Sequence, residues 1–323
     1  YSVRLTLRSF RGSIVPEPIS MRKLYFSLCV LLAFAMSADA AKRPNVVFLV
    51  SEDNSIHYLK LYGYEASTPS IEALAKDGLT FNHAFSNSPV CSVARSTLAT
   101  AMLAPRGGFQ YHRKSAMAKL PPGYKPWSAM LRKAGYFATN QRKTDYNFVH
   151  DMKELWDKGP ANAAWRARPG KDTPFFHMQS FAQSHESSLH FPQSVMDNQK
   201  TVHDPAKVKL APYFPDTPTF RYTHARYLDR MQVIDQQVGG VVKKLEEDGL
   251  LEDTFIFYFG DHGGVLPRGK GYACESGLHV PLVVRIPANF KHLVDHKRGS
   301  RTDGFVSFID FGPTVLHLAG LKP

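Results

Sequence analysis

A cysteine and an arginine stand four residues apart in the segment 89–100, which reads Pro-Val-Cys-Ser-Val-Ala-Arg-Ser-Thr-Leu-Ala-Thr. Turn-forming residues at 87–89 precede it, and the residues that follow favour a helix. A helix that begins near Cys91 places Cys91 and Arg95 on one face, because residues i and i+4 are neighbours on a helix surface. The free N–H groups of its first turn point to the same spot. This arrangement can hold a dianion next to a nucleophile, although a buried cysteine beside a solvated arginine fits the same residues.

Two acidic residues follow an apolar run of strand length. Residues 44–50 read Pro-Asn-Val-Val-Phe-Leu-Val, a pattern typical of a strand that is buried on both faces of a parallel sheet. Glu52 and Asp53 come immediately afterwards. Because open α/β sheets bind ligands at the carboxyl ends of their strands, this pair is a candidate ligand site. A turn or a helix cap is the alternative interpretation.

Segments with strand and helix patterns follow one another along the rest of the chain. Strands are predicted at residues 79–85, 135–139, 174–181, 254–259 and 280–286. Helices are predicted at residues 68–75, 128–134, 222–250 and 307–320. We expect an insertion loop at 156–172 and an irregular surface loop at 194–220. The long helix carries apolar residues at helical spacing, which predicts that they face the core: Tyr227, Met231, Ile234, Val238, Val241 and Leu245.

The N-terminal segment has the features of a secretory signal. Met21 is followed by the basic pair Arg22 and Lys23, an apolar stretch at 24–36, and the small residues Ala-Asp-Ala at 38–40. We therefore expect a signal peptide at 21–40, a non-native upstream segment at 1–20, and an exported protein that is periplasmic or secreted. A membrane anchor would need a longer apolar run, so no stable membrane insertion is expected once the signal is removed.

The chain is strongly basic, with 323 residues and a formal net charge of +12. Residues 1–41 carry +3 of this charge, which leaves +9 for the mature part. Such a surface attracts polyanions. No nucleic-acid-binding motif is present, and a sulfated polysaccharide suits an exported protein better. Of the three cysteines, Cys29 leaves with the signal, and the remaining Cys91 and Cys274 exclude a disulfide framework. We expect no bridge between them.

The cysteine segment resembles the signature of the type I sulfatases, which belong to the alkaline phosphatase superfamily. That signature is Cys-x-Pro-Ser-Arg-x-x-x-Leu-x-Thr-Gly, and its cysteine is oxidised to formylglycine by a maturation enzyme. The four positions Cys91, Arg95, Leu98 and Thr100 match it. Val93, Ala94 and Ala101 stand where the family has Pro, Ser and Gly. The resemblance implies that Cys91 is the precursor of a formylglycine nucleophile.

The resemblance also implies a calcium site. Members of this family open with an apolar strand that ends in Asp-Asp, and a later strand ends in Asp-Asn or Asp-His; these carboxylates bind calcium. Glu52 and Asp53 stand at the first pair, and Asp261 and His262 at the second. Together with the nucleophile derived from Cys91, these four residues are the predicted metal ligands. Asp261 is a suitable hard ligand, whereas His262 is less so because calcium prefers oxygen.

Three further positions correspond to family residues that grip or protonate the substrate. Lys143 matches the lysine of Gly-Lys-x-His, and Lys270 matches a second sulfate-binding lysine. His185 follows a buried strand, as does the family histidine that contacts sulfate and the leaving oxygen. Asp145 stands where the first of these motifs has histidine, and an ionised carboxylate cannot donate a hydrogen bond. Asp145 therefore receives no role from the resemblance.

Taken together, the resemblance implies an α/β, alkaline-phosphatase-like fold with a mixed, mostly parallel sheet and helices on both faces. The expected catalytic domain is 42–323, without the smaller C-terminal sheet subdomain of the family. The implied function is hydrolysis of sulfuric esters on a sulfated carbohydrate. Two alternatives stay open, namely a phosphodiesterase or phosphonate monoester hydrolase of the same superfamily and a non-catalytic binder of sulfated glycans. Neither the sugar nor the oligomeric state can be inferred from the residues.

Overall fold

The computed structural model describes residues 42–113, 117–141, 143–158 and 163–322. The predicted upstream segment at 1–20 and the signal peptide at 21–40 lie outside these residues. Among the described helices, none combines the length and the apolar composition needed to cross a membrane.

A central strand organises the fold. β1 (Asn45–Ser51) is buried along its whole length, and it pairs in parallel with β4 (Phe175–Phe181) on one side and β5 (Thr254–Gly260) on the other. In the described part of the chain the sheet has seven strands in the order β3-β4-β1-β5-β6-β2-β7. β6 (Leu282–Arg285) runs antiparallel to both of its neighbours, and the other pairings are parallel. The predicted mixed, mostly parallel sheet is therefore confirmed.

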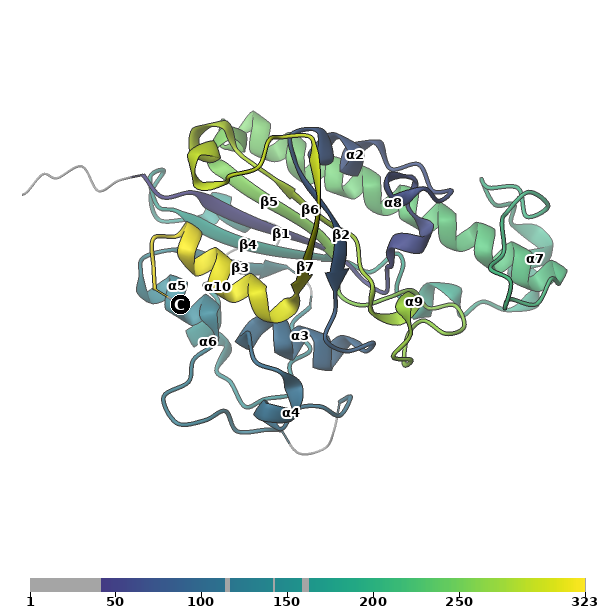
Figure 1. The fold of residues 1–323 in the computed structure, drawn as a ribbon, viewed down its shortest axis with the longest axis horizontal. Helices are drawn as coiled ribbons and strands as arrows, with labels where there is room; N and C mark the ends of the chain where they lie inside the picture. Colours follow the sequence, from purple (N-terminus) through teal and green to yellow (C-terminus); the bar gives the residue numbers. More distant parts are fainter. Residues whose placement is uncertain (1–41, 114–116, 142, 159–162, 323) are drawn as a thin grey trace, which may run out of the picture. The chain divides into compact units, whose positions relative to one another are not determined.

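Helices cover both faces of this sheet (Figure 1). Phe48 and its neighbours on one face of β1 pack against α3 (Cys91–Thr100), α5 (Trp127–Lys133) and α10 (Phe308–Leu318). Val47 and Leu49 on the opposite face pack against α2 (Pro69–Lys76) and α8 (Pro218–Glu247). Successive strand residues point to opposite faces, so a continuous apolar strand supplies two separate cores.

The predicted elements recur with small shifts of their ends. The core face of α8 is buried as expected. The strand β2 (Gly78–Phe85) and the strand β3 (Phe137–Gln141) match their predictions, whereas β7 (Ser300–Ser307) was not predicted. β7 is an edge strand with polar residues, and its Phe305 is 78% exposed, so it lacks the apolar pattern of a buried strand. The remaining short α-helices are α4 (Ala104–Gly107), α6 (Met152–Leu155), α7 (Gln193–Asn198) and α9 (Glu275–Leu278).

The parallel arrangement brings distant loops to one edge of the sheet. β1, β3, β4 and β5 all end there, and they lead directly into residues 52–53, 143–145, 182–186 and 261–262. β2 is followed by a short turn and then by α3, which begins at Cys91. Cys91 and Cys274 are both free thiols among the described residues, as predicted.

A buried histidine gives the fold a predictable dependence on pH. His177 lies on β4 at 1% exposure, and its Nδ1 is 2.8 Å from the hydroxyl of Thr139. Burial lowers the pKa of its imidazole from 6.5 to about 4. Below pH 6.5 the unfolded chain therefore binds a proton that the folded chain does not bind until about pH 4.

We expect the contribution of His177 to be fully present above pH 6.5 and to be lost as the pH falls towards 4, by on the order of 3 kcal/mol. Other groups titrate in the same range, so the measurement is a comparison. Urea unfolding of the wild-type chain and of His177→Gln between pH 7 and pH 4.5 should show a shallower loss of stability in the variant. Parallel curves would show that His177 does not contribute to the pH dependence.

Candidate functional site

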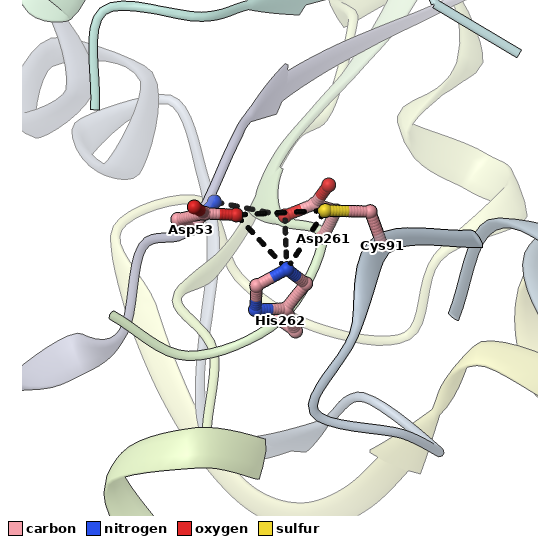
Figure 2. A group of neighbouring side chains, drawn as sticks. All are labelled: Asp53, Cys91, Asp261 and His262. Atoms are coloured by element: carbon pink, nitrogen blue, oxygen red, sulfur yellow. Dashed lines mark hydrogen bonds and ion pairs between the residues drawn. The ribbon is translucent and has the colours of Figure 1, made fainter. Parts of the chain in front are cut away.

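Four side chains meet at the carboxyl edge of the sheet. One potential ligand atom from each of Asp53, Cys91, Asp261 and His262 lies within 4.8 Å of all the others. Figure 2 shows these side chains pointing towards one another. Each of the four residues is completely buried. The sequence separates them by as many as 209 positions, yet the parallel strands and the start of α3 bring them into one cluster.

Two hydrogen bonds hold the backbone of Asp53 in place, one with Asp261 and one with Tyr227. Its backbone adopts a left-handed conformation with φ +51°, which is uncommon for a residue with a side chain. Its N–H donates to Asp261 Oδ1 at 2.9 Å, and the hydroxyl of Tyr227 donates to its carbonyl oxygen. Tyr227 is fully buried on α8. The sequence predicted Tyr227 only as a core residue, because helical spacing does not reveal the hydrogen-bond partner of its hydroxyl group.

His262 presents its Nε2 to the cluster. Its Nδ1 lies 2.9 Å from the carbonyl oxygen of Gly263, which can only accept, so Nδ1 carries the proton. Its Nε2 lies 2.9 Å from Asp53 Oδ1 and 3.2 Å from Cys91 Sγ. Burial lowers the pKa of this imidazole, but the charges of Asp261 and Asp53 outweigh it and raise the pKa to about 10. The carboxylates therefore favour a positive charge at Nε2, which either a proton or a cation can supply.

Cys91 begins α3 and lies against both histidines of the site. Burial and the charge of Asp261 raise the pKa of its thiol, but hydrogen bonds with His185 and His262 outweigh them, so that the pKa is lowered. Its Sγ is 3.7 Å from Asp53 Oδ1. The predicted helix and the predicted position of Cys91 at its first turn are confirmed.

Arg95 lies behind the cluster and is 2% exposed. Its Nε and Nη2 contact Asp261 Oδ2 at 3.1 and 3.0 Å, and its Nη1 donates to Ser180 Oγ at 3.0 Å. Burial lowers the pKa of the guanidinium, but Asp261 and Glu52 outweigh it and raise the pKa. The alternative of a solvated arginine is therefore wrong. Arg95 fixes the orientation of the Asp261 carboxylate.

Glu52 lies beside the cations of the site. Its Oε2 is 2.6 Å from Lys143 Nζ and 3.9 Å from His185 Nε2, and its Oε1 is 3.9 Å from Arg95 Nη2. It is not among the four residues whose ligand atoms converge in the described part of the chain. Its predicted role as a metal ligand stays a prediction. Hydrogen bonding to Cys91 raises the pKa of His185, so this imidazole can carry a proton next to Cys91.

Lys270 reaches the cluster from the loop before α9. Its Nζ lies 2.9 Å from Asp53 Oδ2 and 2.8 Å from Glu186 Oε2. Burial raises the pKa of the Asp53 carboxyl, but His262 and Lys270 outweigh it and hold the pKa well below its usual range. Lys143 and Lys270 are 17% and 14% exposed, so both ammonium groups remain accessible beside the buried cluster.

The structure also shows a charged pair near the site, Arg113 with Asp145, that the sequence did not predict. Asp145, the residue without a role, accepts two hydrogen bonds from Arg113. Arg113 belongs to the loop after α4, and no motif links the two residues along the sequence. A pattern search could not have found the pair, because the contact joins loops that are 32 positions apart.

The chemistry of the converging atoms fits a cation. Two carboxylates and an imidazole lone pair point into one buried volume, and burying such groups without a compensating charge is costly. Oxygen ligands suit calcium, whereas a single neutral imidazole is also a common ligand of transition metals. The residues present therefore fit the predicted metal site.

The chain is similar in sequence to known sulfatases. The chain is 31% identical to an ulvan-active sulfatase of Formosa agariphila, over 87% of this chain and 53% of that protein. It is 26% identical to N-acetylgalactosamine-6-sulfatase of Rattus norvegicus, over 94% of this chain and 67% of that protein. The chain thus spans about half the length of the first of these relatives.

Solved structures share the fold. The structure of Ps i-CgsB in complex with k-i-k-neocarrahexaose matches with a TM-score of 0.63 at 20% identity, over 87% of this chain and 73% of that chain. Phosphonate monoester hydrolase SpPMH from Silicibacter pomeroyi matches with a TM-score of 0.67 at 18% identity, over 87% and 74%. The family model described as Sulfatase matches residues 44–169 and 137–321, which together cover the whole described sheet. The chain therefore belongs to the sulfatase family.

Proposed function

We propose that the protein is a sulfuric ester hydrolase that removes sulfate from a sulfated carbohydrate, with formylglycine derived from Cys91 as its nucleophile and Ca²⁺ as its metal ion. The observation that carries this proposal is the convergence of Asp53, Cys91, Asp261 and His262 within 4.8 Å. A nucleophile precursor, two carboxylates and an imidazole meet in one buried place. Three cations and a protonatable histidine surround them, which is the set that transfer of an anionic group requires.

The metal ion would be held by Asp53, Asp261 and His262, with Glu52 as a further candidate ligand and the residue derived from Cys91 completing the set. When bound, it would supply positive charge that polarises a sulfate oxygen and lowers the pKa of a nearby hydroxyl group. Arg95 supports this set from behind, because its guanidinium fixes the Asp261 carboxylate.

The chain's own cations place the sulfate group. Lys143 and Lys270 are only partly exposed and lie beside the cluster, where Lys143 contacts Glu52 and Lys270 contacts Asp53. Both would bind equatorial sulfate oxygens, and Arg95 would add its charge from a greater depth. Preorganised charge of this kind is usually the largest catalytic contribution, because it acts where negative charge develops in the transition state.

His185 is the proposed general acid. One hydroxyl group of the hydrated formylglycine attacks sulfur and passes its proton to the adjacent Asp53 carboxylate, while the bond from sulfur to the sugar oxygen breaks. That sugar oxygen takes a proton from His185, whose protonated form is favoured by the nearby carboxylates of Asp53 and Glu52. The second hydroxyl group then gives its proton to His185, the bond from carbon to the sulfate oxygen breaks, and sulfate leaves as the aldehyde forms. Asp53 returns its proton to solvent, and a water molecule rehydrates the aldehyde. No water molecule needs to attack the crowded sulfur atom.

The remaining parts of the proposal concern partners and location. The ulvan-active sulfatase and the N-acetylgalactosamine-6-sulfatase are named for sulfated carbohydrates, and the basic surface of this chain suits a polyanionic substrate. We therefore propose a sulfated carbohydrate as the substrate. A maturation enzyme that converts Cys91 and export by the segment 21–40 complete the proposal.

The test is a comparison of ester types on one protein. We expect the matured enzyme to hydrolyse an aryl sulfate and sulfated oligosaccharides, and to act more slowly on the matched phosphate diester and phosphonate monoester. The specificity constants for all four substrates are the measurement. A preference for either phosphorus ester would assign the chain to the hydrolases of that chemistry instead.

A further inference from the structure

We propose that Arg113, held by Asp145, is a specificity-determining residue that binds a second anionic group of the substrate beside the sulfate that is removed. The second group is a carboxylate or another sulfate ester on the same or the neighbouring sugar. This inference rests on the proposed function and deepens it, because it names a feature that the substrate must carry.

The guanidinium of Arg113 is held by two hydrogen bonds to Asp145. Its Nε donates to Asp145 Oδ1 at 3.0 Å and its Nη2 to Asp145 Oδ2 at 2.8 Å, which is the two-pronged geometry of a strong arginine–carboxylate pair. Both residues have left-handed backbones, with φ +45° and φ +54°. Residues other than glycine adopt this backbone conformation only where the surrounding structure imposes it, and such residues often lie at ligand sites.

The loop that carries Arg113 is attached to the nucleophile helix. The N–H of Arg113 donates to Ser92 Oγ at 3.2 Å, and His112 Nδ1 lies 2.8 Å from the same oxygen. Ser92 directly follows Cys91 and is completely buried. Asn147 ties the other loop to the same helix, since its N–H donates to Ser96 Oγ at 2.8 Å. The pair is therefore built onto the same helix as the nucleophile.

A row of alternating charges leads from the cluster to the surface. Glu52 Oε2 contacts Lys143 Nζ at 2.6 Å, Lys143 Nζ lies 3.9 Å from Asp145 Oδ2, and that same oxygen accepts from Arg113. The side chain of Glu52 is 5% exposed, those of Lys143 and Asp145 are 17% and 15% exposed, and that of Arg113 at the outer end is 52% exposed. The scissile sulfate lies at the inner end of this row, so Arg113 meets a different part of the substrate.

The chemistry of the Arg113 guanidinium indicates which group of the substrate it binds. A guanidinium is always charged, and its planar fork matches the two oxygens of a carboxylate or of a sulfate ester. Asp145 occupies the edge of the fork formed by Nε and Nη2, and the Arg113 side chain remains 52% exposed. Asp145 thus acts through Arg113 and is a positioning residue. This role accounts for an aspartate where the family motif has histidine.

The experiment measures binding, so that it does not depend on turnover. The parent protein is Cys91→Ala, and calorimetry gives its dissociation constants for three oligosaccharides of one backbone, which carry one sulfate, one sulfate plus a neighbouring carboxylate, or two sulfates. We expect a preference for a two-anion probe over the one-anion probe. Arg113→Gln should reduce this preference about tenfold or more, because a charge-assisted hydrogen-bond pair is lost.

Two further variants separate the site from general effects of charge. Arg166→Gln removes a matched exposed arginine, which forms a similar pair with Asp248 and lies away from the site on a 3-10 helix at Ala164–Ala167; it should leave the preference unchanged. Asp145→Asn keeps the guanidinium but loosens it, so that the preference falls by less than in Arg113→Gln. Melting temperatures verify that each variant is folded.

The outcomes are distinct. Whether the carboxylate or the second sulfate gives the larger preference identifies the second anion, and either result supports the proposal. No preference in the parent protein, no reduction in Arg113→Gln, or an equal reduction in Arg166→Gln overturns it. Failure of the proposed function has a different signature, which is the absence of sulfate release by the mature wild-type enzyme while the binding preference persists.

Discussion

Replacement of Cys91 by alanine is expected to reduce sulfate release by at least about 10⁴-fold, because loss of a covalent nucleophile removes the main reaction path. The methyl group of alanine can be neither oxidised to an aldehyde nor hydrated. Cys91 is completely buried at the start of α3, and alanine favours a helix, so the fold should persist. The measurement is initial-rate kinetics on an aryl sulfate, with far-UV circular dichroism as the check of folding.

Cys274→Ala is the matched control for this prediction. Cys274 is the other free thiol in the described part of the chain, and it lies in the loop just before α9, outside the cluster of four. We expect its replacement to leave the rate within about twofold of wild type, as for a substitution outside the reacting groups. Equal losses in both variants would show that activity follows from thiol chemistry in general and would contradict a specific role of Cys91.

Mass spectrometry of the Cys91 peptide tests the same nucleophile independently of any assay. Conversion to formylglycine makes the residue about 18 Da lighter than cysteine, in contrast to the heavier products of the ordinary oxidation ladder. We expect this lighter peptide in protein isolated from the native host. An unmodified thiol in the native protein would favour the alternative of a non-catalytic binder of sulfated glycans.

The sequence predicted the architecture well because strong local patterns coincide with the elements that form the core. The continuous apolar run at 44–50 can be buried only between two layers, and the structure places it in β1 at the centre of the sheet. The helical spacing in α8 likewise leaves one face to bury. Cys91 and Arg95 were expected on one helical face, and both indeed face the buried cluster from α3.

The parts that the sequence missed depend on contacts between segments that are far apart in the chain. The donation from Tyr227 to the Asp53 carbonyl and the pairing of Arg113 with Asp145 each join segments that have no shared period or motif. Glu52 illustrates the same limit. Its place after β1 favours a ligand, but whether it faces the ion or Lys143 depends on side-chain torsions that no local pattern records. Which charged side chains pair with one another in this site therefore depends on the tertiary structure.

Removal of the metal ion is expected to have the second large effect. Dialysis against EGTA should reduce the rate by about 10²-fold or more, since a major source of charge stabilisation is lost, and Ca²⁺ should restore it. Binding also stabilises the folded state by about 2.7 kcal/mol at a concentration of one hundred times the dissociation constant. For a chain of this size, that corresponds to a rise in melting temperature of roughly 5 °C. Thermal unfolding with and without Ca²⁺ measures it independently of activity.

Substitutions decide which atoms hold the ion. Asp53→Asn and Asp261→Asn each remove a negative charge from the converging set, so the thermal response to Ca²⁺ should largely disappear. His262→Gln replaces the imidazole nitrogen with an oxygen donor, and because calcium prefers oxygen the response should survive. If Zn²⁺ stabilises the wild type more than Ca²⁺ does, and His262→Gln abolishes this effect, the resident ion is a transition metal and the assignment to calcium is wrong.

Glu52→Gln resolves the remaining ligand. If Glu52 serves mainly to hold Lys143, as its 2.6 Å contact indicates, the variant keeps the thermal response to Ca²⁺ and loses affinity for the substrate instead, because the ammonium group is no longer fixed. If Glu52 binds the ion, the response weakens as it does in Asp53→Asn. The two outcomes differ in calorimetric Ca²⁺ affinity and in KM, so one pair of measurements assigns this carboxylate either to the metal or to the cations around the sulfate.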